Sequence, residues 1–264
     1  MLDIVSTSYG SAPYLNLNYE LLRCKRPFRW IVIDNSPFPE KLNPNFEVHN
    51  GPQGRVPKND NSVGNGSFYH GLALDESIGY LNMSNRFALF LDPDFYIIPS
   101  IDTILDYMML KDLAFFGAAY SNTKKALIRN FPVAYCLFVD TTKVNVYEDS
   151  FTFAAGGLNI QEDIYPDVGW RIYKYYNHYP NEYVIPHLDD SPFDDHKFTK
   201  GNLTKLYKVD VPKPTTEYFW KGQPFAIHTR MKVEKFNKEN RKIRVDNQVK
   251  MAGNLIRTVR RCLQ

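Results

Sequence analysis

The feature that most constrains this chain is an apolar run at residues 87–91 that ends abruptly at Asp92-Pro93-Asp94. A short, continuous apolar run is typical of a strand buried on both faces, which favours the interior of a parallel α/β sheet. Ligands of such sheets bind beyond the carboxyl ends of the strands. Two carboxylates at that position can hold a hard divalent cation such as Mg²⁺ or Mn²⁺. Asp and Pro also end strands simply by forming turns, so a plain turn is the competing interpretation.

Two earlier segments also combine an apolar run with a polar end. Residues 2–9 predict a first strand that runs into a polar loop, and residues 30–36 predict a second strand that ends in Asp-Asn-Ser. Leucines at helix-compatible positions within residues 14–24 predict a helix between the two strands. A unit of this kind pairs its strands in parallel through a right-handed crossover.

A third strand and a second helix are predicted before the Asp-Pro-Asp segment. Residues 46–48 form the short strand, and residues 51–66 form a loop rich in Gly, Asn, Pro and Asp that leads into a helix near Ser67. The loop lacks both the phosphate-binding P-loop pattern and the dinucleotide fingerprint. The order of elements predicts an α/β fold.

Four blocks of sequence, in this order, resemble the nucleotide-sugar-binding half of a GT-A glycosyltransferase, particularly the large inverting family that includes rhamnosyl- and galactosyltransferases. The blocks are residues 4–9, 31–36, 61–67 and 89–94. Residues 167–172 and 225–228 extend the similarity more loosely, so that it covers most of residues 2–230. The resemblance implies a Rossmann-like, mixed but mostly parallel central sheet flanked by helices.

The resemblance also implies where a nucleotide sugar would bind. Thr7 and Tyr9 would lie beside the nucleotide, and Asp34 would hydrogen-bond the base. We interpret the loop before the second helix as one that approaches the ligand, with Asn65 and Ser67 close to the diphosphate or the sugar. The competing interpretation of Asp34 is that its side chain caps a turn.

A metal site follows from the same resemblance. Asp92 would face the ribose or the metal, Asp94 would be the main metal ligand, and His228 would complete the coordination of Mn²⁺ or Mg²⁺. Such a cation would stabilise the negative charge that grows on a nucleoside diphosphate as the glycosidic bond breaks. An ordinary core histidine is the competing interpretation of His228.

Glycosyl transfer with inversion needs a general base beside the acceptor hydroxyl, and a carboxylate is the usual choice. Proline at residue 166 predicts the start of a helix, with Asp167 in its first turn, where the helix dipole would keep it ionised. Asp167 is therefore the predicted base. Asp163 is the rival, and a purely helix-stabilising role for Asp167 is the alternative to both.

Other functions compete with this interpretation. Residues 187–196 hold His187, His196 and four aspartates, which could serve a zinc or di-metal hydrolase, but no helical i, i+4 pair of histidines preorganises them, so a flexible acidic loop is the favoured interpretation. A nucleotidyltransferase would also use an α/β sheet and a carboxylate-held metal, but the Gly-rich basic signature is missing from residues 6–10. A catalytically inactive carbohydrate-binding homologue is a further alternative.

The end of the chain has a separate pattern. Apolar residues recur at spacings of four and three, which predicts an amphipathic helix over the last twenty or so residues with a basic face. The residues are Val245, Val249, Ala252, Ile256, Val259 and Leu263. The helix could pack on the catalytic domain, lie on an anionic membrane or dock a second subunit.

Length and composition set the outer bounds. A chain of 264 residues with 44% hydrophobic content can bury one substantial core. We divide it into a catalytic domain at residues 1–230, with a nucleotide-sugar half at about 1–100 and an acceptor half at about 101–230, and a basic helical extension at residues 231–264. Three scattered cysteines, no apolar stretch of about 20 residues and no signal-peptide pattern favour a cytoplasmic protein, with peripheral contact at the inner face of a membrane as a variant.

The expected function is metal-dependent transfer of a sugar from a nucleoside-diphosphate sugar to a hydroxyl acceptor, in polysaccharide or glycoconjugate synthesis. A UDP-sugar is favoured because Asp34 is compatible with uracil. The acceptor would be a saccharide or a lipid-linked sugar. The net charge of +3 is too small to indicate nucleic acid as a partner. Inversion rests on the resemblance alone.

Overall fold

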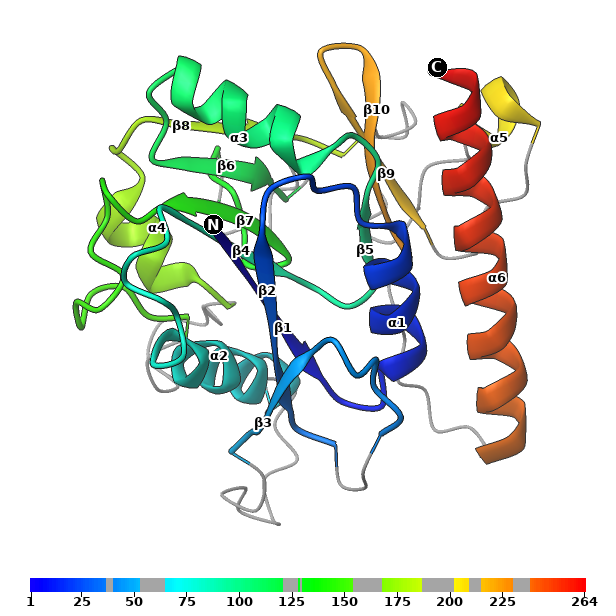
Figure 1. The fold of residues 1–264 in the computed structure, drawn as a ribbon, viewed down its shortest axis with the longest axis horizontal. Coiled ribbons are helices and arrows are strands. Elements are labelled where there is room, and N and C mark those ends of the chain that lie inside the picture. Colours follow the sequence, from blue (N-terminus) through cyan, green and yellow to red (C-terminus); the bar gives the residue numbers. More distant parts are fainter. Residues whose placement is uncertain are drawn as a thin grey trace, which may run out of the picture.

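A seven-stranded mixed sheet forms the centre of the molecule (Figure 1). The computed structural model describes residues 1–36, 40–52, 65–120, 128, 130–153, 168–186, 202–208, 215–229 and 238–264, without the side chains of 65–68, 202, 204, 205 and 238–244. The strand order is β3-β2-β1-β4-β7-β6-β8. The strands are β1 (Leu2–Ser8), β2 (Phe28–Asp34), β3 (Glu47–Asn50), β4 (Phe87–Leu91), β6 (Phe115–Ala118), β7 (Cys136–Asp140) and β8 (Asn181–Val184).

Strand direction confirms the predicted fold class. β2, β1 and β4 pair in parallel, as do β3 with β2 and β6 with β8, whereas β7 runs antiparallel to both β4 and β6. The sheet is thus mostly parallel. Every residue of β4 is buried, as the unbroken apolar run predicts for a strand covered on both faces. The register pairs Ile4 of β1 with both Trp30 and Leu89.

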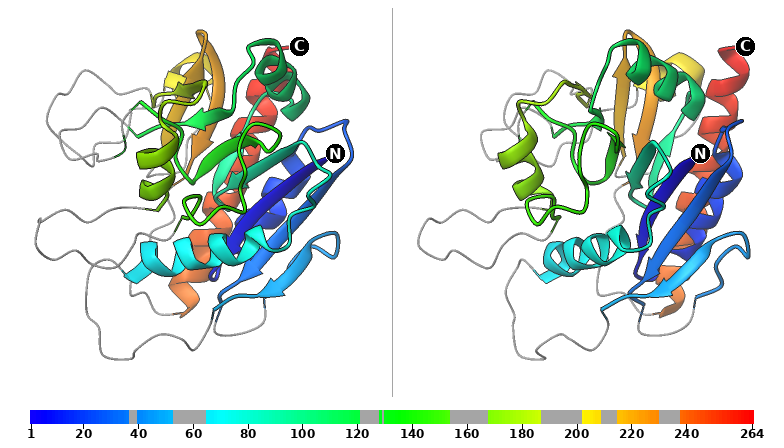
Figure 2. Two further views of the ribbon diagram at one scale, coloured as in Figure 1. Left: turned by 90° about the vertical axis from the view of Figure 1, so that its left-hand side faces the viewer. Right: turned by 60° about the vertical axis from the view of Figure 1, so that its left-hand side comes forward.

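Helices cover both faces of this sheet (Figure 2). They are α1 (Ala12–Leu21), α2 (Asn65–Ile78), α3 (Ile101–Leu110), α4 (Trp170–Tyr176), α5 (Asn202–Tyr207) and α6 (Lys238–Cys262). In the right-hand view of Figure 2, α2 lies on one side of β1 and β2, and α1 with α6 lies on the other. Leu15 of α1 and Leu74 of α2 are both buried in the main core, so each face of the sheet is sealed by an apolar helix stripe.

A second, three-stranded antiparallel sheet stands beside the first. Its order is β5-β10-β9, with β5 at Phe95–Ile97, β9 at Thr216–Trp220 and β10 at Gln223–His228. β5 begins directly after the Asp92-Pro93-Asp94 segment, so that segment joins the two sheets. The pairing of β10 with β5 places His228 opposite Phe95.

The C-terminal helix packs on the domain along the predicted stripe. Ala252, Ile256 and Val259 are fully buried against α1 and the small sheet, while Leu263 is 45% exposed, so the stripe ends one turn earlier than predicted. α6 also begins earlier than expected, at Lys238. The side chain of Arg260 is buried and donates hydrogen bonds to three backbone carbonyls, those of Leu21, Ile97 and Ile98. No helix among the described residues is long and apolar enough to span a membrane.

Candidate functional site

The Asp92-Pro93-Asp94 segment is a tight turn between the two sheets. The backbone N–H of Phe95 donates to the carbonyl of Asp92 at 3.1 Å, which closes a four-residue turn with proline at its second position, a favoured place for it. The N–H of Asp92 donates to the carbonyl of Tyr135 at 3.0 Å. Asp94 is only 5% exposed. The segment is thus a turn, and its role as a pair of metal ligands, which a turn does not rule out, stays a prediction.

His228 reaches this turn from a distant part of the chain. Its Nε2 atom lies 3.2 Å from Oδ1 of Asp94 and 3.9 Å from Oδ2 of Asp92. One ligand atom from each of the three residues lies within 4.8 Å of the others, and His228 is 7% exposed. The three predicted metal ligands thus converge on one point at the carboxyl end of β4.

Aromatic rings fix the orientation of the His228 imidazole. The ring centroids of Phe95 and Tyr135 lie 5.4 and 5.1 Å from it. The hydroxyl of Tyr135 donates to the carbonyl of Ala119 at 2.7 Å and lies 3.2 Å from the hydroxyl of Tyr218, which holds its ring in place. Nδ1 of His228 is buried and forms no hydrogen bond with any described residue, so the orientation depends on ring packing rather than on a second hydrogen bond.

A second histidine, which the sequence analysis missed, contacts the same turn. Nε2 of His70, in α2, lies 3.4 Å from Oδ1 of Asp92. Each oxygen of the Asp92 carboxylate therefore has an imidazole nitrogen within 4 Å, from His70 at Oδ1 and from His228 at Oδ2. The signal in the sequence was weak, because His70 follows the predicted helix start at Ser67 by only three residues but belongs to no motif.

The predicted nucleotide residues lie at the carboxyl ends of β1 and β2, the edge from which β4 leads to the turn. Thr7 pairs with Ile33 in the β1–β2 register and is half-buried, while Tyr9 is 53% exposed. Oδ1 of Asp34 accepts a hydrogen bond from the N–H of Ser36 at 2.9 Å. The turn-capping interpretation of Asp34 is thus correct for that oxygen, and a contact of this carboxylate with a base remains a prediction.

The N-terminus of α1, which lies at this edge, is occupied by a carboxylate of the chain itself. Glu40 accepts hydrogen bonds from the N–H groups of Ser11 and Ala12 at 3.3 and 3.4 Å, and a short one from the hydroxyl of Ser8. In dinucleotide-binding folds the helix after the first strand offers these N–H groups to a phosphate. In this chain two of these N–H groups, those of Ser11 and Ala12, already donate to Glu40.

Several predicted residues fall outside the described part of the structure. They are Asp163, Asp167 and residues 187–196, together with the side chains of Asn65 and Ser67 in the first turn of α2. The expected helix start at residue 166 differs from the described one: the helix α4 begins at Trp170, and its N-cap Gly169 adopts a left-handed conformation with φ of 83°. The role of Asp167 as a base stays a prediction.

Comparison by sequence finds no relative: no protein-family model matches the chain, and no curated protein matches it. Comparison by structure finds distant similarities. The galactosyltransferase LgtC in complex with donor and acceptor sugar analogs has a TM-score of 0.49 and 13% identity, over 96% of this chain and 95% of LgtC. The mannosyltransferase PcManGT from Pyrobaculum calidifontis, in complex with GDP-Man and Mn²⁺, has a TM-score of 0.36 and 9% identity over 53% of this chain.

TarS from S. aureus has a TM-score of 0.33 and 16% identity over 49% of this chain. The chain spans only 44% of the length of PcManGT and 23% of that of TarS. All three TM-scores lie below 0.5, so these similarities are distant.

Proposed function

We propose that this chain is a metal-dependent glycosyltransferase that moves a sugar from a nucleoside-diphosphate sugar to a hydroxyl acceptor. One observation carries the proposal. Asp92 and Asp94, in the turn that joins the two sheets, and His228, at the end of β10, bring their ligand atoms within 4.8 Å of one another at the edge of a mostly parallel sheet where ligands of such sheets bind.

The donor set fits a divalent cation. Two carboxylates and an imidazole suit Mn²⁺ better than Mg²⁺, which prefers oxygen ligands and keeps several waters. When bound, such a cation supplies neutralisation of the charge that develops on a leaving diphosphate. His70 contacts the carboxylate oxygen of Asp92 that is not the one nearest His228, and we assign it the role of orienting this carboxylate.

Glu40 occupies the N-terminus of α1, and this is a reason to expect a cation in the site. A phosphate bound there would have to displace Glu40 from two backbone N–H groups and from the hydroxyl of Ser8. Its own negative charge would also meet that carboxylate. Compensation for a diphosphate must therefore come from another direction, and the Asp92–Asp94–His228 cluster provides a place for positive charge.

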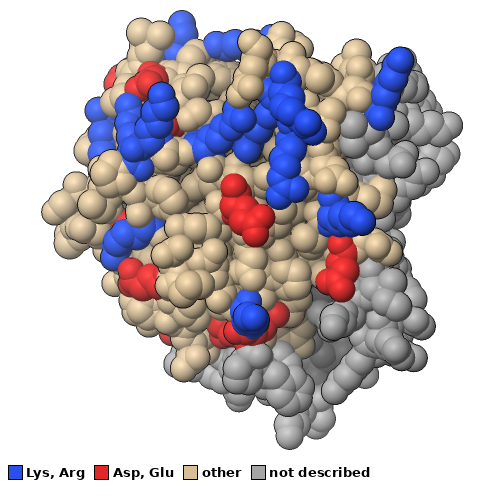
Figure 3. Space-filling view, turned by 45° about the vertical axis from the view of Figure 1, so that its right-hand side comes forward, with Lys and Arg blue, Asp and Glu red and all other residues tan. Residues whose placement is uncertain are grey.

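The remaining roles belong to the same proposal. Thr7, Tyr9 and Asp34 would contact the nucleoside, for which uridine is our choice, while Asn65 and Ser67 would approach the diphosphate or sugar. Asp167, or Asp163 in its place, would act as the base of an inverting transfer. Exposed cations follow α1, at Arg23 and Lys25, and lie in the last turns of α6, at Arg257 and Arg261; they would suit an anionic lipid-linked acceptor. Figure 3 shows that Lys and Arg side chains gather on the upper half of one face of the molecule.

The test is Mn²⁺-dependent binding and turnover of UDP-sugars. With UDP at about 100 times its Kd and Mn²⁺ present, ligand binding should stabilise the wild-type protein by about 2.7 kcal/mol, which raises Tm by about 5–10 °C. Asp94→Asn should lose this shift and the release of UDP. Asp106→Asn, an exposed aspartate of α3, is the matched control and should keep both.

Two results would overturn the proposal. An equal shift with and without Mn²⁺, or in Asp94→Asn, would remove the metal site from nucleotide binding. Release of pyrophosphate from nucleoside triphosphates, with no release of UDP from UDP-sugars, would instead identify a nucleotidyltransferase.

A further inference from the structure

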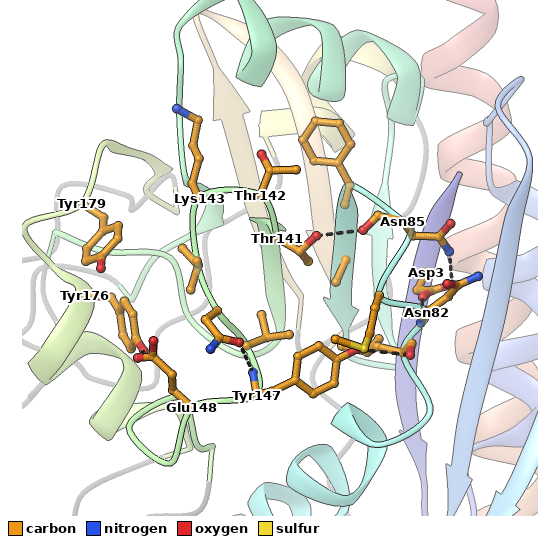
Figure 4. Close-up of a pocket in the computed structure, with 17 residues that line it drawn as sticks. Asp3, Asn82, Asn85, Thr141, Thr142, Lys143, Tyr147, Glu148, Tyr176 and Tyr179 are labelled. Carbon is orange, nitrogen blue, oxygen red and sulfur yellow. Dashed lines mark hydrogen bonds between the residues drawn. The ribbon is translucent and has the colours of Figure 1, made fainter.

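A cavity of about 410 Å³ lies at the edge of the large sheet opposite the Asp92–Asp94 turn (Figure 4). β1 and β4 begin at this edge, and the antiparallel β7 ends here, since Phe87 pairs with Asp140. Residues 81–88 form one wall and residues 141–148 form another. The volume is within the range of about 300–1,000 Å³ that is typical of small-molecule pockets. Because β1 and β4 run from this cavity toward the turn, it is separate from the candidate metal site.

Hydrogen bonds hold the walls of the cavity in place. The side chain of Asp3 is 1% exposed; its Oδ1 atom accepts from Arg29 at 2.9 Å and from Asn85 at 2.8 Å, and its Oδ2 atom accepts from the N–H of Asn82 at 2.7 Å. The hydroxyl of Tyr147 reaches from one wall to the other and donates to the carbonyl of Leu81 at 3.2 Å. The cavity is therefore formed before any ligand binds.

The charges around the cavity favour a neutral ligand. Asp3 is paired with Arg29, and Lys143 is paired with Asp112, so neither offers an uncompensated charge. Oε2 of Glu148 accepts a hydrogen bond from the hydroxyl of Tyr176 at 3.2 Å. Glu148 has no basic partner among the described residues. Its carboxylate would repel a phosphate or another anion, but it would accept hydrogen bonds from the hydroxyl groups of a neutral ligand.

The cavity offers a ligand aromatic rings and polar atoms that are not engaged in hydrogen bonds with other described residues. Tyr147 is 41% exposed although it is a large aromatic residue. Tyr179, Asn145 and Glu148 line the same cavity. The hydroxyl of Tyr179, Nδ2 of Asn145 and Oε1 of Glu148 have no hydrogen-bond partner in the described part of the chain. Tyr rings with a few well-placed polar groups match the apolar faces and hydroxyl groups of a sugar ring.

We propose that this cavity binds a neutral saccharide. The binding itself depends only on these residues; its purpose, to hold an acceptor or product chain away from the metal site, rests on the proposed function. Figure 4 shows Tyr176 and Tyr179 on one side of the space and Asp3, Asn82 and Asn85 on the other, so a bound ring would lie between aromatic and polar walls.

Saturation-transfer difference NMR tests the proposal with a panel of methyl glycosides of glucose, galactose, mannose, rhamnose and N-acetylglucosamine, without nucleotide or metal. At least one glycoside should receive saturation from the wild-type protein, and Tyr147→Ala should lose most of that signal. Tyr175→Ala is the matched control, because Tyr175 is 43% exposed but lies outside the cavity. Tyr147→Phe keeps the ring and should keep the signal.

Three outcomes would overturn the proposal: no saturation of any glycoside by the wild-type protein, an undiminished signal in Tyr147→Ala, or loss of the signal in Asp94→Asn, which would place the sugar at the metal site. Asn145→Trp, which fills the cavity from an exposed position, replaces Tyr147→Ala if that variant does not fold. A saccharide signal without any UDP release would sustain the cavity and refute only the proposed function. Normal UDP release by a protein that gives no saccharide signal would refute the cavity proposal and support the proposed function.

Discussion

Replacing His70 by alanine is expected to weaken Mn²⁺ binding about tenfold. Nε2 of His70 lies 3.4 Å from Oδ1 of Asp92, and the two side chains are 26% and 19% exposed. Loss of a residue that orients a metal ligand typically costs about 10–100-fold in metal affinity. The long contact and the partial exposure place His70 at the low end of that range, since water weakens the interaction. A tenfold loss corresponds to about 1.4 kcal/mol.

Isothermal titration of the metal-free protein with Mn²⁺ measures this loss directly and does not depend on turnover. His49→Ala is the matched control, because His49 is also 26% exposed and is also paired with a carboxylate, that of Glu47 at 3.0 Å. It should leave the affinity for Mn²⁺ unchanged. His70→Gln retains an N–H donor on a side chain of similar reach and should recover part of the affinity.

Two results would refute this reasoning in different ways. Affinity within about twofold of the wild type in His70→Ala would show that Asp92 needs no support from α2, well short of the usual cost of losing an orienting residue. A loss of about a thousandfold or more would exceed what such a residue costs and would make His70 a ligand itself.

Three further predictions concern stability and are measured by urea unfolding. Tyr96→Phe should stabilise the protein by about 1 kcal/mol, because the Tyr96 hydroxyl is buried without a hydrogen bond from any described residue. Burial also raises the pKa of Tyr96 well above its usual value of 10. Above pH 10 the tyrosine therefore loses its proton in the unfolded chain but keeps it in the folded one, and the free energy of unfolding of the wild type should fall by up to about 1.4 kcal/mol per pH unit. Tyr96→Phe should reduce this slope. Arg260→Met should cost about 3 kcal/mol by leaving three buried carbonyls without their charged donor, whereas Met at the exposed neighbour Arg261 should cost almost nothing. Gly117→Ala should cost about 3 kcal/mol or more, because its Cβ atom would lie 1.9 Å from the carbonyl oxygen of Cys136.

Features of this fold that depend on residues close together in the sequence were predictable from the sequence. The apolar run at residues 87–91 became β4 with the same bounds, and the two carboxylates after it face one candidate site. The first two strands and the helix between them also lie where the pattern predicts them. In each case the signal is local, because burial on both faces requires an unbroken apolar run and a strand end requires turn residues.

Contacts between distant segments were not predictable in this way. Nothing in the pattern of residues 215–229 indicates that β10 pairs with β5, and the prediction that His228 is a metal ligand rested only on a family resemblance. The contact of His70 with Asp92 depends on the angle at which α2 crosses the sheet, and no motif encodes that angle. Likewise, Arg260 is buried instead of lying on the expected basic face. Its guanidinium donates hydrogen bonds to the carbonyl groups of Leu21, Ile97 and Ile98, which come from distant parts of the chain.

The way in which the candidate ligands are held argues that they are in position before a cation arrives. Asp94 directly precedes β5, and its carbonyl accepts a hydrogen bond from the N–H of Thr229 at 3.1 Å, one residue after His228. The His228–Phe95 pairing in the β10–β5 ladder lies next to this bond, so the two candidate ligands, Asp94 and His228, are separated by a few hydrogen-bonded backbone atoms. A site built on paired strands loses little conformational entropy when it binds its ligand. Metal affinity should therefore depend on the small sheet as much as on the three side chains, and the small sheet in turn depends on α6, which covers Ile227 and Tyr96.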